Sequence, residues 1–139
     1  MTKQLPKPQK RELLIDSDIL IRLLKGNVEI EKELNNIGLQ NILICQVVML
    51  EMFYNVEAKS TKTLVEFLKP MKNIPLSETK GEIALTLVKG YPKQLKAADS
   101  LIAATARNYD LVLYTNNLKD FEGIAGLTLY KPNFHKLPL

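Results

Sequence analysis

Short apolar runs alternate along this chain with longer segments in which apolar residues recur every three or four positions. The runs are typical of buried strands and lie at 12–16, 41–45, 111–115 and 126–130. A further extended piece at 73–76 contains Pro75, which cannot donate to a strand ladder. We therefore expect this piece at the edge of a sheet.

The longer segments have the periodicity of amphipathic helices. They predict helices over 17–25, 28–37, 47–59, 61–68, 78–89 and 97–108, with a basic loop over 91–96 and a polar turn over 116–121. Gly26 and Gly38 can terminate the helices before them, and Ser77 is a typical N-cap. Strands that alternate with helices in this way favour an α/β fold, with a mostly parallel sheet covered on both faces.

The composition is that of an ordinary globular protein. Of the 139 residues 46% are hydrophobic and 24% charged, which fits one domain with a core of its own. We divide the chain into a flexible basic arm over 1–11 and a single domain over 12–139. No apolar run approaches the ~20 residues of a membrane span, and the arm lacks the apolar core of a secretory signal. The single cysteine, Cys45, cannot form an internal disulfide and is expected to be buried. The lack of a secretory signal and of an internal disulfide fits a cytoplasmic location.

The chain carries a mild excess of positive charge. Its net charge is +4 and its pI is near 9.1, which favours an anionic partner, and nucleic acid is the obvious one.

Four acids follow the predicted strands or open the helices after them. They are Asp16, Glu51, Asp99 and Asp120. Each alone has a structural explanation, such as a helix cap, a first-turn partner of the helix dipole or a turn residue. In a parallel sheet, however, all of these positions face one rim, where unpaired carboxylates repel one another. A cation would remove that conflict, and oxygen ligands without histidine or thiolate suit Mg²⁺ or Mn²⁺ rather than Zn²⁺. The only histidine, His135, lies in the tail and is expected to face solvent.

The segments around these acids resemble the sequence motifs of PIN-domain ribonucleases. They are Leu14–Ile21, Val47–Tyr54, Asp99–Ala106 and Leu113–Phe121. The resemblance covers residues 12–130, and the third and fourth segments together are the most specific. By size, the VapC-type toxins of toxin–antitoxin pairs are the most similar members. The resemblance implies a three-layer α/β/α sandwich around a central, mostly parallel sheet.

The resemblance also implies a role for several residues. The metal ligands would be Asp16, Glu51, Asp99 and Asp120. Thr115 and Asn117 would support the site. Asp18 stands where the family most often has Asn, and it could cap the helix or bind the metal through water. Toxins of this type usually form homodimers and are inhibited by an antitoxin whose tail enters the active-site groove.

The hypothesis that follows is a Mg²⁺- or Mn²⁺-dependent endoribonuclease that hydrolyses RNA phosphodiester bonds with a metal-activated water. No nucleophilic side chain is required. Basic residues near the inferred rim are candidates for phosphate contacts, which position RNA without reading its sequence. They are Lys93, Lys96, Arg107 and Lys119.

Two alternatives stay open. A PIN-like domain could bind RNA or a protein without cleaving, although a purely structural domain gains nothing from four clustered acids. An aspartyl-phosphate phosphotransfer domain also gathers acids at a strand rim, and Asp16-Ser17-Asp18 resembles its acid pair. That scheme calls for Thr or Val where Leu20 stands, and it gives Glu51 no role.

Overall fold

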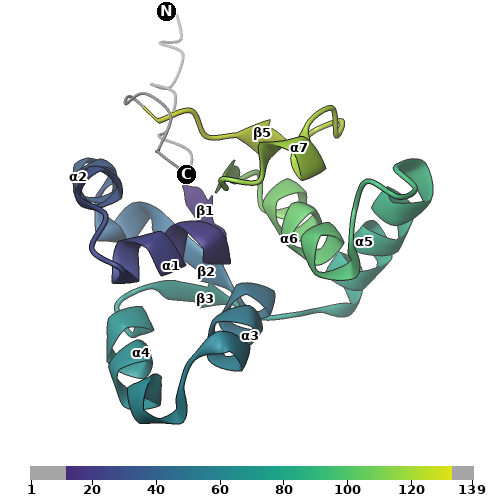
Figure 1. Ribbon diagram of the computed structural model, residues 1–139. Helices are drawn as coiled ribbons and strands as arrows, with labels where there is room; N and C mark the ends of the chain where they lie inside the picture. The colour runs from purple at the N-terminus through teal and green to yellow at the C-terminus, as the bar shows by residue number, and fades with distance from the viewer. Residues whose placement is uncertain (1–11, 133–139) are drawn as a thin grey trace, which may run out of the picture.

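The computed structural model describes residues 12–132 (Figure 1). The arm predicted over 1–11 and His135 lie outside the described residues. Five parallel strands form one sheet in the order β3-β2-β1-β4-β5. The strands are β1 (Leu13–Ile15), β2 (Ile42–Cys45), β3 (Lys72–Ile74), β4 (Val112–Tyr114) and β5 (Thr128–Leu129). The extended piece before Pro75 is thus an edge strand, as predicted, and β1, which Asp16 follows, is the central strand.

Seven α-helices cover the sheet within residues 12–132. They are α1 (Ser17–Leu24), α2 (Val28–Ile37), α3 (Gln46–Asn55), α4 (Thr61–Leu68), α5 (Glu78–Gly90), α6 (Ala97–Asn108) and α7 (Leu118–Phe121), with short 3₁₀ helices η1 (Leu39–Asn41) and η2 (Ala58–Ser60). Helices α1 and α2 form a hairpin, and α5 lies along α6 (Figure 1). The predicted three-layer α/β/α sandwich is confirmed. No helix in this part of the chain has the length and apolar character to cross a membrane.

The core is built on β1, whose side chains are buried at every position. Leu13 lies opposite Ile42 on one side and Val112 on the other, so β1 is held by two parallel neighbours. On α6, alanines including Ala103 and Ala104 are fully buried, because small side chains let this helix pack closely. Cys45 is buried at the end of β2, as expected.

Three sequence-based boundaries were wrong. The helix expected over 47–59 ends at Asn55, after which Val56 is extended. The Asn55 side-chain amide donates to the Glu51 carbonyl at 2.9 Å, the kind of local bond that favours helix ends. The turn expected over 116–121 contains α7, which is too short to show an apolar period. The strand expected over 126–130 pairs only at two residues.

Candidate active site

Asp16 lies immediately after β1, at the carboxyl edge of the sheet. Its backbone N–H donates to the Tyr114 carbonyl of β4 at 2.9 Å, which continues the ladder by one residue. One carboxylate oxygen, Oδ1, accepts the Ser17 N–H at 2.8 Å and so caps α1. The other, Oδ2, accepts the Thr115 hydroxyl at 2.8 Å. The side chain is only 5% exposed, so Asp16 is both the helix cap and a fixed acid of the rim.

Asp18 lies in the first turn of α1 and reaches the loop after β4. Its Oδ2 accepts the Asn116 N–H at 3.0 Å. Its Oδ1 is buried and has no hydrogen-bond partner within the described residues. Burial and the neighbouring charge of Asp16 raise the pKa of Asp18 to about 6. A buried carboxylate oxygen without a hydrogen-bond donor is costly in free energy unless a cation or another group binds it. This oxygen of Asp18 is therefore available as a ligand beside the rim.

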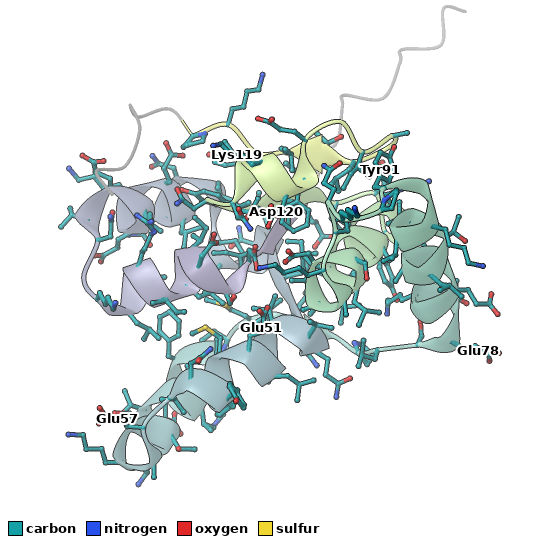
Figure 2. All side chains as sticks on the ribbon, turned by 45° about the vertical axis from the view of Figure 1, so that its right-hand side comes forward. Glu51, Glu57, Glu78, Tyr91, Lys119 and Asp120 are labelled. Atoms are coloured by element: carbon teal, nitrogen blue, oxygen red, sulfur yellow. The ribbon has the colours of Figure 1, made fainter. Side chains whose placement is uncertain are left out.

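Three further acids arrive from three different helices. Glu51 extends from α3, and its Oε1 accepts the Ser17 hydroxyl at 3.4 Å. Asp99 lies in the first turn of α6, and Asp120 in α7 accepts the side-chain amide of Asn117. In Figure 2, Glu51 and Asp120 lie on either side of the middle of the molecule, from α3 and α7 respectively.

The charges of these acids act on one another. Burial and then the charges of Asp16 and Asp99 raise the pKa of Glu51. Burial and then the charges of Asp16 and Asp120 raise the pKa of Asp99 to about 6. Burial also raises the pKa of Asp16, and the hydrogen bonds from Thr115 and Ser17 oppose that shift. The acids that are separate in sequence therefore share one electrostatic environment, which favours binding of a cation.

Comparison with known proteins decides the family. The sequence model of the PIN domain matches residues 13–127, which is most of the chain. The chain belongs to the PIN-domain family. The site described above is therefore built on a PIN fold.

Solved structures agree with this PIN-domain assignment. A chain of a toxin–antitoxin complex from Klebsiella pneumoniae is 30% identical, with a TM-score of 0.73 over 84% of this chain and 96% of that one. VapBC2 from Rickettsia felis, bound to a DNA fragment, is 22% identical, with a TM-score of 0.74 over 85% and 96%. DNA-bound VapBC from Salmonella typhimurium is 19% identical, with a TM-score of 0.77 over 86% and 97%. The search of curated proteins gave no match.

The donor set of this PIN domain fits a hard divalent cation. The site offers carboxylate oxygens, including the vacant Oδ1 of Asp18, and Mg²⁺ and Mn²⁺ prefer such ligands. Among residues 12–132 no ion pair joins the rim acids to a lysine or arginine. In the same range, no three His, Cys, Asp or Glu side chains are already arranged to hold a metal ion. The site thus offers suitable oxygen ligands for a divalent cation, but these ligands are not yet arranged in a coordination geometry.

The predicted phosphate-contacting residues divide into two groups. Lys96 precedes α6 and lowers the pKa of Asp99 against the larger effect of burial, Lys119 adjoins Asp120, and Lys93 is exposed in the loop 91–96. Arg107 does not lie at the rim. It is in the last turn of α6, about 12 Å along the helix axis from Asp99, beside Gly126. The sequence-based placement of Arg107 was wrong because it took no account of which end of the helix meets the rim.

Sequence reasoning gave no role to several residues that contact the acids. Ser17 bonds to Glu51, and the backbone of Asn116 bonds to Asp18. Gln94 reaches the backbone of α7 from the loop 91–96. Ser17 and Asn116 could have been suspected because each adjoins a motif acid, whereas Gln94 carries no signal in the sequence.

Proposed function

We propose that this PIN-domain protein is a metal-dependent endoribonuclease and the toxin of a toxin–antitoxin pair. The observation that supports the proposal is that acids from four separate segments lie near enough at the carboxyl edge of the sheet for their charges to act on one another. Their pKa shifts link them as one site, because Asp99 responds to both Asp16 and Asp120, and Glu51 responds to both Asp16 and Asp99.

In this proposal Asp16, Glu51 and Asp99 hold Mg²⁺ or Mn²⁺, and Asp120 is the fourth acid. The bound cation would supply a Lewis acid that makes a water more acidic and stabilises negative charge on the scissile phosphate. The protein's own contribution is to orient the ligands. Thr115 and Ser17 fix the two oxygens of Asp16 in different directions, and the Ser17 hydroxyl also holds Glu51. No serine or cysteine is needed as a nucleophile.

RNA is the proposed substrate. Lys93, Lys96 and Lys119 are exposed on the elements that carry or adjoin Asp99 and Asp120. Positive side chains around a carboxylate cluster suit binding of a phosphodiester backbone. The lysines attract the phosphates, and the bound cation would reduce the repulsion between the phosphates and the carboxylates. Contacts of this kind position an RNA strand without recognising its base sequence.

The test is a cleavage assay with purified protein on a mixed single-stranded RNA, with Mn²⁺ or with EDTA. Wild type is expected to cleave with Mn²⁺ only, and Asp99→Asn to lose at least about 100-fold in rate while remaining folded. Glu82→Gln on the exposed face of α5 is the matched control and should cleave like wild type. Full activity of Asp99→Asn, or activity in EDTA, contradicts the proposal. Binding of RNA without cleavage supports the binding-module alternative.

An antitoxin is the proposed protein partner. The support is the set of solved relatives, which are described as toxin–antitoxin and VapBC complexes. An apolar groove of about 370 Å³ lies between the α1–α2 hairpin and α4 and suits an amphipathic segment. It is lined by Leu23, Leu34, Leu39, Phe67, Pro70 and Met71, together with the polar residues Glu31 and Asn35. Co-expression with the product of the neighbouring reading frame should abolish RNA cleavage and give a complex that co-purifies, and Leu39→Arg should weaken that complex.

A homodimer is the proposed assembly. Gln46, Leu50 and Tyr54 are exposed at a spacing of four residues, so they lie along one face of α3. Leu50 and Tyr54 are 60% and 89% exposed, which is unusual for large apolar side chains on neighbouring turns. Leu76 lies beside this face, since its backbone N–H donates to the Gln46 side chain at 2.9 Å, and it is exposed as well. We name Gln46, Leu50, Tyr54 and Leu76 the α3 surface.

A further inference from the structure

We propose that the loop 91–96 is a clamp that holds α7 against α6, with Gln94 as a positioning residue for Asp120. The inference deepens the proposed function, because it concerns the fourth acid of the same site and rests on that site binding a cation. The side-chain hydrogen bonds of Gln94 go to backbone carbonyls of the segment 120–125 and not to the Asp120 carboxylate. Gln94 acts through the backbone that carries Asp120.

The central contact is the side-chain amide of Gln94. Its Nε2 donates to the Glu122 carbonyl at 2.7 Å and to the Asp120 carbonyl at 3.3 Å. An amide nitrogen has two hydrogens, so both bonds can form at once. Helix α7 is only four residues long, and its last carbonyls have no partner within the helix. Gln94 supplies the donors that a longer helix would provide itself.

A second contact fixes the chain that leaves α7. The Tyr91 hydroxyl accepts the Ala125 N–H at 2.9 Å. Between the two contacts, Phe121 and Ile124 are buried in the core. The segment 120–125 is therefore held at both ends by the loop and in the middle by apolar packing.

The loop itself is well anchored. The Gln94 N–H donates to the Tyr91 carbonyl at 3.2 Å, and the Tyr91 N–H donates to Leu87 at the end of α5 at 2.9 Å. Leu95 is buried, and Lys93 has a φ of 67°, a left-handed conformation that non-glycine residues seldom adopt. A loop with a specific backbone shape and a buried anchor can position what it contacts.

The clamp connects two acids that repel each other. The loop 91–96 leads directly into α6, which carries Asp99 in its first turn. Asp120 lies in α7, and ionised carboxylates on neighbouring elements repel each other, which favours separation of α7 from α6. The Asp120 side chain accepts one hydrogen bond, from Asn117 of its own turn, which does not link it to α6. Gln94 and Tyr91 therefore supply polar contacts that hold the segment 120–125 against the loop that leads into the helix of Asp99.

The experiment compares Mn²⁺ affinity and backbone exchange in the full chain. Gln94→Glu keeps the length of the side chain and removes the amide donor. Gln94→Ala removes the amide donor together with most of the side chain. Tyr91→Phe removes only the hydroxyl that accepts the Ala125 N–H. The matched control is Asn41→Ala, because Asn41 also donates a side-chain amide to the end of a helix, at Ile37 of α2, in a region remote from the rim. We expect Gln94→Ala and Gln94→Glu to weaken Mn²⁺ binding by about 10-fold in calorimetric titrations, and Asn41→Ala to change it less than about 2-fold.

Hydrogen exchange in metal-free protein supplies a readout that needs neither metal nor RNA. Amides of residues 118–125 should exchange at least about 10-fold faster in the Gln94 variants and in Tyr91→Phe, while those of 97–108 keep their wild-type rates. In a double-mutant cycle, Gln94→Ala should cause no further loss of Mn²⁺ affinity once Asp120 is replaced by Asn. Wild-type exchange at 118–125 in both Gln94 variants overturns the clamp, and so does a fully additive cycle. If wild type binds no Mn²⁺, the proposed function fails, and the exchange data alone decide whether the loop holds α7.

Discussion

The hydroxyl of Thr115 donates to the buried carboxylate of Asp16 at 2.8 Å, although the two residues are 99 positions apart in the chain. The same hydroxyl accepts the Asn117 N–H at 3.0 Å. Thr115 therefore joins the end of β1 to the loop after β4, and it fixes both the direction of one Asp16 oxygen and the start of α7.

Replacing Thr115 by Val is the first prediction. The volume is kept, but a buried carboxylate oxygen and a backbone N–H both lose their partner, which should cost about 1–3 kcal/mol in the free energy of unfolding. Urea unfolding measures this loss. Thr86→Val is the control: its hydroxyl bonds to the Glu82 carbonyl on the exposed face of α5 and should matter by less than about 0.5 kcal/mol. Equal effects of the two substitutions would show that the Thr115–Asp16 bond has no special weight.

The raised pKa values predict how stability depends on pH in the metal-free protein. The pKa of Asp18 and of Asp99 rises from 3.8 to about 6 on folding, so the folded state binds more protons than the unfolded chain between these values. The stability that protonation of these two carboxyl groups contributes is fully present below pH 3.8 and is lost as the pH rises through about 6. Asp99→Asn should therefore stabilise the protein at pH 7, by on the order of 1 kcal/mol after allowance for solvent screening.

The gain from Asp99→Asn should shrink as the pH falls below about 5, because the wild-type carboxyl then becomes neutral as well. Urea midpoints of both proteins across this pH range, in EDTA, provide the measurement. Glu82→Gln should differ from wild type by less than about 0.5 kcal/mol. A destabilised Asp99→Asn at neutral pH would mean that Asp99 is not opposed by its neighbours.

Addition of Mn²⁺ should stabilise the folded protein, because the unfolded chain lacks the assembled acids. At a concentration 100 times the dissociation constant the gain is about 2.7 kcal/mol in the free energy of unfolding. Thermal or urea unfolding with and without the ion measures the gain. Asp16→Asn and Asp99→Asn should remove most of it, whereas K⁺ at equal ionic strength should give none. Equal stabilisation of wild type and both variants would place the ion elsewhere.

The α3 surface predicts the oligomeric state. Leu50→Glu and Tyr54→Glu place a charge on exposed side chains, so the fold should be kept while a contact between two copies is lost. Light scattering after gel filtration should show a dimer for wild type and a monomer for both variants. Leu85→Glu, on an exposed face of α5, tests whether that helix takes part in the same contact. A monomeric wild type at high concentration would refute the dimer.

The buried Lys80 gives a prediction remote from the proposed site. It is 1% exposed, donates to the Pro75 carbonyl and lies 4.8 Å from the centre of the Tyr109 ring. Lys80→Met keeps the apolar stem but removes the donor and the cation–π contact, and should cost about 1–3 kcal/mol. Urea unfolding measures it, with the exposed Lys89→Met as the control on the same helix. An unchanged midpoint would show that the ammonium contributes only by filling space.

The sequence by itself determined the order of strands and helices, the family and the four acids. These are local signals: an apolar run at 12–16, small residues along 97–108, and acids at the end of a strand or in the early turns of helices. Because parallel strands place their carboxyl ends on one side, the rim followed from the alternation alone. The same local reasoning failed at α7, where four residues are too few to show a period.

The tertiary structure decided which side chains meet at that rim. The bond between Thr115 and Asp16 depends on the parallel register of β1 and β4, and Gln94 reaches α7 only because of the shape of its loop. The same is true of Arg107, which the sequence placed near the acids and the direction of α6 places far from them. Such contacts depend on register and side-chain direction, which are set by packing between segments distant in the chain. The acids, by contrast, were visible because the end of a strand or the start of a helix marks each of them in the sequence itself.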